Sequence, residues 1–354
     1  MKKFNFAMVA LLAATLAVLP LRMEPAKAAE ESDWSMYFPT DIDGHWAYDE
    51  LDNFVVADLM KGYKDSKGVV TIKPDKSVTR AEFVALLVRA LGLTSNESGK
   101  TFSDVETDQW YYEPVRIASS LGVVNGVSDS EFGPNKLINR GDIATMIVRA
   151  FDDTVAFDSS SKALPFGDVP SYYAASSIKA AYLAGIVNGI TDKAFKPFAN
   201  AKRAEAAVML QRALSLQKTQ LPDDGMLKTI VLQSDRVEYD AINNDGLQSL
   251  NANYSNYFTA FQLSANRAYG DVLKNIDSEG YTMKAEETSA RKLDVTFSTN
   301  RFAIVSSTGG AYRFSYSLDG EEAVQNQSND GLYYMKKMED NSWKIYAVYQ
   351  ETVQ

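Results

Sequence analysis

The segment Val78-Thr79-Arg80-Ala81-Glu82-Phe83 decides the fold of the first part of this 354-residue chain. Thr79 is of the residue type that caps helix N-termini, and Glu82 stands three residues further on, the spacing of a capping box. Apolar residues then recur at helical spacing as far as Ala90. The segment therefore predicts an amphipathic helix with a well-defined first residue.

Outward from this helix, the chain repeats one unit three times. In the middle copy the unit reads Phe102-Ser-Asp104-Val105, Trp110-Tyr-Tyr, Gly122-Val-Val-Asn-Gly126, Phe132-Gly-Pro134 and Asn139-Arg140-Gly-Asp142. Matching positions are 60 to 64 residues apart, as in the series Gly62, Gly126, Gly189 and the series Arg80, Arg140, Arg203. The third copy departs from the first by Tyr173 in place of Trp and Lys202 in place of the capping Thr.

Each unit predicts two helices joined by a structured loop. An aromatic residue at position 46, 110 or 173 opens the first helix, and a glycine at its end, such as Gly185, tolerates the left-handed conformation of a C-cap. The Phe-x-Pro loop comes next, because proline cannot continue a helix. One unit is too small to bury a good core alone, so we expect the three to pack together.

These motifs resemble the S-layer homology (SLH) domain, whose pattern they follow at F-x-D-V, W-A, G-(I/V)-V-x-G, F-x-P and T-R-A-E-F. We place the three repeats at residues 34–93, 99–155 and 163–216. The resemblance implies an all-α, pseudo-threefold, three-pronged spindle. It also implies binding of secondary cell wall polysaccharide in the peptidoglycan-associated wall, often through a pyruvylated glycan, in grooves between repeats.

The residues that the resemblance implicates in polysaccharide binding occupy matching motif positions. They are the arginines Arg80, Arg140 and Arg203, the aromatic residues Trp46, Trp110 and Tyr173, the aspartates Asp41, Asp104 and Asp168, and the glycines Gly62, Gly126 and Gly189. A guanidinium grips the carboxylate of a pyruvate ketal, a ring stacks on a sugar face, an aspartate accepts hydrogen bonds from hydroxyls, and glycine lets the backbone approach. The alternatives are a solvated arginine, a packed ring, an aspartate that caps the first helix, and a glycine at its C-cap.

Composition excludes several functional classes. The chain has 36 Lys and Arg against 46 Asp and Glu, and the net charge of -10 argues against non-specific nucleic-acid binding. Without cysteine there is no disulfide, thiolate zinc site or cysteine nucleophile. The one histidine, His45, occupies a position that the other copies fill with Gln109 and Tyr172, and we interpret it as an exposed structural residue. We expect no cofactor and no metal site.

Residues 1–28 have the pattern of a secretory signal peptide. Lys2 and Lys3 precede an apolar stretch, and Ala26-Lys-Ala28 offers a small-x-small cleavage site. The alternative is an uncleaved anchor helix, but the apolar run ends at Pro20, short of the roughly 20 residues that a span needs. We expect an exported protein at the cell wall or S-layer of the cell surface, with no membrane span after cleavage.

The C-terminal part, residues 226–354, follows a polar segment at 217–225 that predicts a linker. Helical patterns at about 226–243, 247–257 and 263–276 give way to alternating apolar and polar residues from Tyr281, with turn signals at Gly309-Gly310 and Asp319-Gly320. With the Asn-x-Trp-Lys-Ile segment at 341–345, this part resembles the nuclear transport factor 2-like (SnoaL-like) fold. The resemblance implies an α+β cone-like domain in which a curved antiparallel sheet encloses a pocket.

Three functional hypotheses are compatible with this organisation. The leading one is a non-catalytic protein that the repeats anchor to the wall, with a C-terminal domain that binds a ligand or protein of unknown identity. The alternative is a wall-tethered enzyme, which a buried Asp or Glu of raised pKa beside a tyrosine in an open pocket would favour. A structural subunit of a surface layer ranks last, because roughly 130 residues beyond the anchor are few for a lattice. We expect no enzymatic activity and name no catalytic residue.

Overall fold

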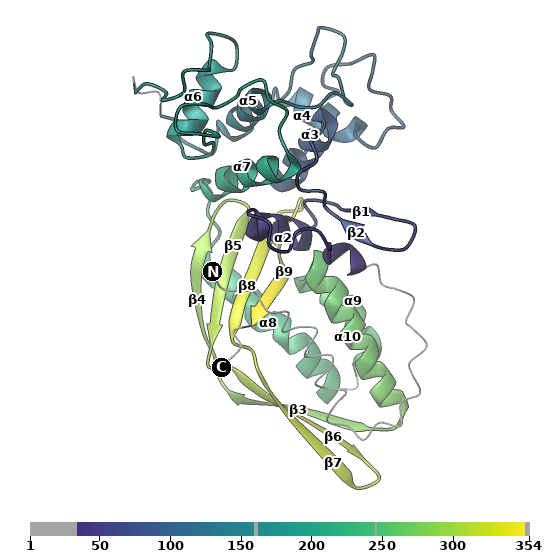
Figure 1. Ribbon diagram of the computed structural model, residues 1–354. Coiled ribbons are helices and arrows are strands. Elements are labelled where there is room, and N and C mark those ends of the chain that lie inside the picture. The colour runs from purple at the N-terminus through teal and green to yellow at the C-terminus, as the bar shows by residue number, and fades with distance from the viewer. Residues whose placement is uncertain (1–33, 159–161, 245, 351–354) are drawn as a thin grey trace.

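The computed structural model describes residues 34–158, 162–244 and 246–350, and Figure 1 shows a repeat module at one end of the molecule and a C-terminal domain at the other. The predicted signal peptide, residues 1–28, lies outside the described residues. In the part that the structure describes, no helix is long and apolar enough to cross a membrane.

Each repeat contributes two helices, preceded in the first repeat by the short 3-10 helix η1 (Trp34–Tyr37). The first helices are α2 (Tyr48–Val56), α4 (Tyr112–Ser120) and α6 (Ala175–Leu183), and the second helices are α3 (Arg80–Leu91), α5 (Arg140–Phe151) and α7 (Arg203–Ser215). The predicted capping box of α3 is present, since Thr79 accepts from the backbone of Glu82 while the Glu82 carboxylate accepts from Thr79 N. The local capping signal therefore set the start of this helix.

The repeats close into a ring by exchanging helix contacts. The first helix of each repeat packs on the second helix of the repeat before it: α4 on α3, α6 on α5, and α2 on α7. Because α2 of the first repeat meets α7 of the third, the ring is complete. Each helix is thus covered mainly by a helix of another repeat, which is the physical reason that three repeats are needed.

The prediction of an all-α module is wrong. The loop of the first repeat forms an antiparallel hairpin of β1 (Tyr63–Lys64) and β2 (Val70–Thr71). In addition, the extended residues before the three second helices pair around the pseudo-threefold axis: Val78 N donates to Ala201 O (3.0 Å), Ala201 N to Ile138 O (2.9 Å) and Ile138 N to Val78 O (3.0 Å). An N-cap residue requires extended backbone, and at the axis that backbone finds its hydrogen-bond partners in the neighbouring repeats.

The C-terminal domain begins with the helices α8 (Asp224–Asn243), η2 (Leu247–Ser249), α9 (Leu250–Tyr257) and α10 (Ala260–Ser278). The strands that follow are β3 (Thr282–Ser289), β4 (Lys292–Ser298), β5 (Phe302–Thr308), β6 (Ala311–Leu318), β7 (Glu321–Ser328), β8 (Gly331–Lys337) and β9 (Trp343–Gln350). All their pairings are antiparallel.

These strands form two sheets, so the prediction of one curved sheet is also wrong. The orders are β3-β6-β7 and β4-β5-β8-β9. The chain crosses between the two sheets three times, after β3, after β5 and after β7, and at the turn between β5 and β6 Gly309 has a positive φ of 82° that a side chain would resist. Figure 1 shows β3, β6 and β7 extending away from the repeat module, while β5, β8 and β9 reach toward α2. The resemblance to the nuclear transport factor 2-like fold stays a prediction.

The apolar core of the repeat module extends into the C-terminal domain, which also has a second core of its own between its helices and strands. Phe302, Tyr346 and Ala347 of the C-terminal sheet belong to the same buried cluster as the repeat helices. Tyr346 Oη donates to Asn53 Oδ1 (2.8 Å) and Lys336 Nζ to Ala57 O (2.6 Å), both across this interface. The segment predicted as a linker also docks, because Gln217 is buried and donates to Thr154 Oγ1 (3.0 Å). The C-terminal domain is therefore held against the first repeat.

Candidate functional site

The three motif arginines lie at the junctions between repeats rather than in solvent. Arg80, Arg140 and Arg203 are all buried, at the first turn of α3, α5 and α7. Their Nε atoms donate to the backbone of the next repeat's loop: Arg80 to Phe132 O (3.0 Å), Arg140 to Phe195 O (2.9 Å) and Arg203 to Ile72 O (2.8 Å). The solvated-arginine alternative is therefore wrong, and each guanidinium holds two repeats together.

A second backbone oxygen and one carboxylate complete each arginine site. The Nη2 atoms donate to Asn125 O (3.1 Å), Asn188 O (2.7 Å) and Lys61 O (3.1 Å), in the order Arg80, Arg140, Arg203. The Nη1 atoms pair with Asp142 (3.1 Å), Glu205 (2.6 Å) and Glu82 (3.5 Å) in the same order. Burial lowers the pKa of Arg80 and of Arg140, against the opposing charge of Asp142 and Glu205.

The acidic partners Asp142, Glu205 and Glu82 are not among the site residues predicted from the sequence. Glu82 uses one carboxylate oxygen for its own capping box, and its other oxygen accepts from Tyr63 Oη (2.6 Å) and faces Arg203. The motif Thr-Arg-Ala-Glu therefore carries two outward connections: the arginine reaches the following repeat and the glutamate receives the arginine of the preceding one. An acid follows the arginine by two residues in all three copies, as Glu82, Asp142 and Glu205. Helix capping is a sufficient explanation of that spacing in the sequence, so the spacing does not predict the ion pair.

The predicted aromatic residues are exposed. Trp46, Trp110 and Tyr173 expose 65%, 61% and 65% of their surface, whereas the motif phenylalanines Phe102 and Phe166 are buried. Packing was the alternative for these rings, and such exposure decides against it. His45, beside Trp46, differs from expectation: its side chain is only 12% exposed, and its Nδ1 accepts from Ala47 N (3.2 Å) at the start of α2.

One cavity brings three kinds of predicted residue together. It has a volume of about 230 Å³ and is lined by Arg203 of the third repeat, Gly62 and Glu82 of the first, and Trp110 of the second. The exposed indole stands at a cavity that contains a guanidinium and a carboxylate. A planar apolar surface beside a cation is what an acidic sugar requires.

The junction between the first and second repeats has a different polar arrangement. There Tyr173 Oη donates to Asp142, the same carboxylate that pairs with Arg80. Partial desolvation of its hydroxyl beside Asp142, together with this hydrogen bond, raises the pKa of Tyr173 above its usual value, although most of the ring is exposed. The tyrosine that replaces tryptophan in the third copy is therefore tied to the acid, so the junctions are chemically unequal.

The motif aspartates hold the loops of their own repeats. Each carboxylate accepts two backbone N–H bonds of 2.7–2.9 Å: Asp41 from Ile72 and Lys73, Asp104 from Phe132 and Gly133, and Asp168 from Phe195 and Lys196. The N-cap positions of the first helices are Ala47, Tyr111 and Ala174, so the capping alternative is wrong. The aspartates shape the loop that receives the arginine.

The motif glycines Gly62, Gly126 and Gly189 lie where the structure leaves no room for a side chain. A Cβ on Gly62 would lie 2.7 Å from Val70 Cγ1, one on Gly126 2.8 Å from Phe102 Cε1, and one on Gly189 2.5 Å from Phe166 Cε1. Gly122 and Gly185, with φ of 70° and 76°, follow the C-caps of α4 and α6 instead. The C-cap alternative is therefore wrong for Gly62, Gly126 and Gly189, whose missing side chains allow close packing of the loop.

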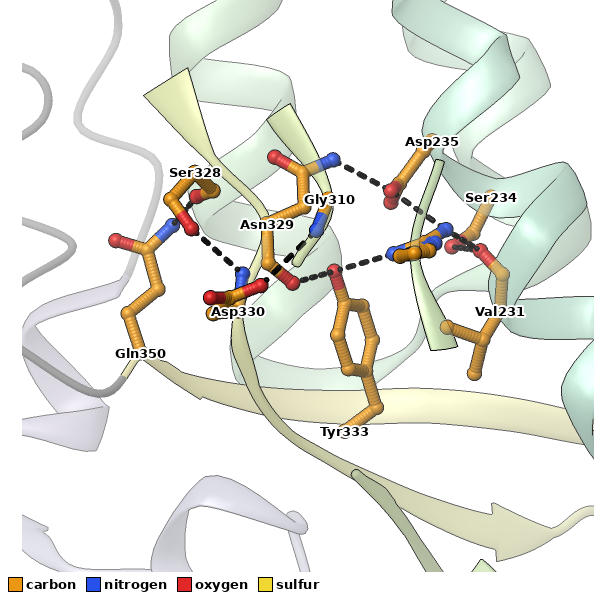
Figure 2. Close-up of polar contacts among 10 residues, drawn as sticks. Val231, Ser234, Asp235, Gly310, Ser328, Asn329, Asp330, Tyr333 and Gln350 are labelled. Atoms are coloured by element: carbon orange, nitrogen blue, oxygen red, sulfur yellow. Dashed lines mark hydrogen bonds and ion pairs between the residues drawn. The ribbon is translucent and has the colours of Figure 1, made fainter. Parts of the chain in front are cut away.

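A second candidate site lies in the C-terminal domain, between α8, α10 and the strands. A cavity of about 90 Å³ is lined by Asp235, Glu238, Gln262, Asn266, Tyr312 and Tyr333 among others. Figure 2 shows Asp235 and Asn329 turned toward each other near Tyr333; Asn329 Nδ2 donates to Asp235 Oδ2 (2.5 Å). Arg291 pairs with Asp235 (2.6 Å) and also donates to Tyr333 Oη (3.0 Å). Burial raises the pKa of Asp235 to about 6, although Arg291 opposes the shift.

Glu238 is the unusual acid of this cavity. Its carboxyl group is enclosed by protein and accepts a hydrogen bond from Tyr254 Oη (2.7 Å). Burial raises its pKa to about 7, since the hydrogen bond from Tyr254 offsets only part of the desolvation. Nothing in the local pattern of α8 distinguishes Glu238 from the exposed acid Asp240 on the same helix, so the sequence does not single it out.

Comparison with known proteins agrees with the architecture of the repeats. The S-layer homology domain model matches residues 40–84, 101–144 and 165–207. An amylopullulanase of Thermoanaerobacterium thermosulfurigenes is 31% identical over 173 residues, 48% of this chain and 9% of that protein. A cellulosome-anchoring protein of Acetivibrio thermocellus is 26% identical over 45% of this chain and 36% of that protein. The surface-layer 125 kDa protein of Lysinibacillus sphaericus is 30% identical over 57% of this chain and 16% of that protein.

The chain thus spans well under half the length of these relatives. The family match and the surface-layer and anchoring relatives support a secreted location at the cell wall or cell surface. The ring of α2 to α7 consists of three S-layer homology domains.

Proposed function

We propose that the three S-layer homology domains anchor this protein non-covalently to the bacterial cell wall by binding an anionic secondary wall polysaccharide. The observation that carries this proposal is the cavity in which Arg203, Gly62 and Trp110, from three different repeats, converge. A glycan bound there touches every repeat, so binding and closure of the ring support each other.

The finer part of the proposal is that the ligand carries a carboxylate, as a pyruvate ketal does. Each guanidinium has five N–H groups. In Arg203, the arginine of this cavity, Nε and Nη2 donate to backbone carbonyls and Nη1 faces Glu82 at 3.5 Å. The remaining N–H groups are preorganised, because the bonds to loop carbonyls fix the plane of the guanidinium. A carboxylate at the cavity rim gains charge-assisted hydrogen bonds there, while the sugar face stacks on the exposed ring.

Removal of the exposed rings is expected to weaken wall binding without unfolding the module. We predict that Trp110→Ala reduces binding to native wall sacculi about tenfold, and that the triple variant Trp46→Ala, Trp110→Ala, Tyr173→Ala loses it almost completely, because avidity over several grooves is lost. Co-sedimentation with native wall measures both. Leu121→Ala, a change at another exposed apolar residue of the second repeat, is the matched control.

Two further wall samples separate anchoring from carboxylate recognition. Wall stripped of its secondary polysaccharide should bind no variant. Wall from which the pyruvate ketals alone are removed should bind the intact protein weakly. Undiminished binding to depyruvylated wall would contradict the carboxylate interaction and leave the anchoring function standing, whereas undiminished binding to stripped wall would contradict both.

For the C-terminal domain we propose binding of a small polar group rather than catalysis. Its cavity of about 90 Å³ is well below the roughly 300 Å³ of an ordinary ligand pocket. One observation favours the alternative of a wall-tethered enzyme: Glu238 has the raised pKa and the tyrosine partner of a general acid.

Turnover of wall material distinguishes the two functions. We expect that the mature protein releases no soluble reducing sugar or peptide from native wall, and that Glu238→Gln behaves identically. Release of soluble fragments by the intact protein, abolished in Glu238→Gln with wall binding retained, would instead establish the enzyme.

A further inference from the structure

An interdomain cavity lies between the first repeat and the C-terminal sheet, away from the cavity of Trp110. Its volume is about 510 Å³. The repeat contributes Asp58, Arg89 and Gly92, and the C-terminal domain contributes Arg301 at the start of β5 with the end of β8 and the β8–β9 turn. Residues distant in the chain thus build one compartment at the interface that Figure 1 shows between α2, α3 and the sheet.

The charge of this compartment is opposite to that of the protein. Five cationic side chains line it, Arg89, Arg301, Lys336, Lys337 and Lys344, against three carboxylates, Asp58, Glu339 and Asp340. The chain as a whole carries a net charge of -10. An excess of two positive charges in one cavity of an acidic protein is a local feature that the overall charge does not explain.

Arg301 is the central residue of this cavity. Its Nε is buried and has no hydrogen-bond partner. The guanidinium lies directly over Gly92 at the C-terminal end of α3, where a Cβ would come within 2.6 Å of Nη1. Burial lowers the pKa of Arg301 to about 10, and the charge of Glu339 offsets only part of this shift. A buried guanidinium N–H without a hydrogen-bond partner is rare, because nothing offsets the cost of its desolvation.

Two more cations are desolvated beside it. Lys336 Nζ donates to Ala57 O (2.6 Å) and Arg89 Nε to Leu59 O (2.9 Å), so each meets a carbonyl rather than a carboxylate. Burial lowers the pKa of Lys336 to about 8, and Arg301 adds to the shift while Asp58 opposes it. Among residues 34–158, 162–244 and 246–350, none of these three cations forms an ion pair.

We propose that this interdomain cavity binds a phosphate dianion, either inorganic phosphate or a phosphate monoester, through Arg301, Lys336 and Arg89. Two excess positive charges match a dianion better than a carboxylate. A tetrahedral oxyanion also offers enough acceptors for a guanidinium fork and an ammonium at once. Its binding links the first repeat to the C-terminal sheet, and it does not depend on the proposed wall-binding function.

The test is binding of inorganic phosphate to the full mature protein at pH 7.5, by titration calorimetry and by thermal unfolding against sodium chloride of equal ionic strength. We expect one phosphate per chain and a rise in melting temperature that chloride does not produce. Arg301→Gln should bind phosphate at least about tenfold more weakly, since it loses the guanidinium donors. In phosphate-free buffer the same variant should melt no lower than the parent protein, because the lost charge had no partner.

Three comparisons make the result specific. Lys193→Gln, at an exposed lysine of the third repeat, should leave phosphate affinity unchanged. Dimethyl phosphate, a monoanion, should bind more weakly than phosphate if charge matching is correct. Glucose 6-phosphate separates the sources: tighter binding than phosphate assigns a phosphorylated sugar, and weaker binding assigns the free ion. Equal stabilisation by phosphate and chloride, or parental phosphate affinity in Arg301→Gln, would overturn the proposal.

Discussion

Replacement of Arg140 by alanine is expected to destabilise the repeat module by about 3–5 kcal/mol, the range for breaking a buried ion pair by removal of one partner. The change leaves the carbonyls of Phe195 and Asn188 without their donor and Glu205 without its cation. Each buried group that loses its partner costs about 1–3 kcal/mol. It also opens the ring at the junction of the second and third repeats.

Urea unfolding followed by circular dichroism measures this loss, with Arg149→Ala as the control. Arg149 lies on the same helix, α5, but is exposed, and its removal should change stability by less than about 0.5 kcal/mol. Arg140→Lys should fall between the two, because an ammonium keeps the charge but cannot reach both carbonyls and Glu205 in the fixed geometry of a fork. Equal midpoints for Arg140→Ala and Arg149→Ala would show that the arginine junction contributes nothing to the fold. Loss of wall binding in arginine variants therefore has to be separated from loss of folding, which is why the exposed rings are the better functional probes.

Replacement of Glu238 by glutamine is expected to stabilise the C-terminal domain at pH 8 by up to about 3 kcal/mol. The physical reason is the raised pKa: burial moves the Glu238 carboxyl from 4.5 to about 7, so its ionised form is disfavoured in the folded state. Glutamine has nearly the same shape and stays neutral, and its side-chain oxygen still accepts from Tyr254 Oη.

The sign of the pH dependence follows from the same shift. Between pH 4.5 and 7 the folded protein holds a proton that the unfolded chain releases, so the free energy of unfolding falls as the pH rises through this window. The full penalty is present above pH 7 and absent below pH 4.5. The gain in Glu238→Gln should follow this course, from almost nothing at pH 4 to its maximum at pH 8.

Thermal unfolding of both proteins from pH 4 to pH 8 measures this difference. Asp240→Asn, at an exposed acid of the same helix, should give a difference that does not change across the window. A Glu238→Gln protein that is less stable than the parent at pH 8 would show that the ionised carboxylate is favoured in the fold. In that case the tyrosine hydrogen bond, rather than desolvation, dominates its environment.

In the C-terminal sheets, the local sequence pattern does not predict every strand or the way the strands pair. The turn at Asp319-Gly320 was visible in the sequence, and both residues have positive φ, 52° and 87°. The strand after it, β7, has the polar sequence EEAVQNQS and carried no alternation to predict it. Its conformation depends on pairing with β6 across that turn. The division into two sheets likewise depends on pairings between strands and not on the pattern within any one of them.

The interface between the repeats and the C-terminal domain also could not be predicted from the sequence. The Asn-x-Trp-Lys-Ile segment at 341–345 indicates the C-terminal fold from its own residues. That Tyr346 donates to Asn53, 293 positions earlier, has no local signature. The cavity of Arg301 and Lys336 exists only because this interface forms.

By itself, the sequence determined the threefold repetition, the first residues of the second helices, and the residue types at each junction. These properties follow from capping, periodicity and spacing, all of which act within a few residues. The tertiary structure alone decided what each of those residues does. Arg203 reaches a carbonyl 131 positions away, so its burial, its acid and its distance from Trp110 depend on closure of the ring. The physical reason is that desolvation and ion pairing depend on which chain segments meet, and that is settled by packing of the whole core.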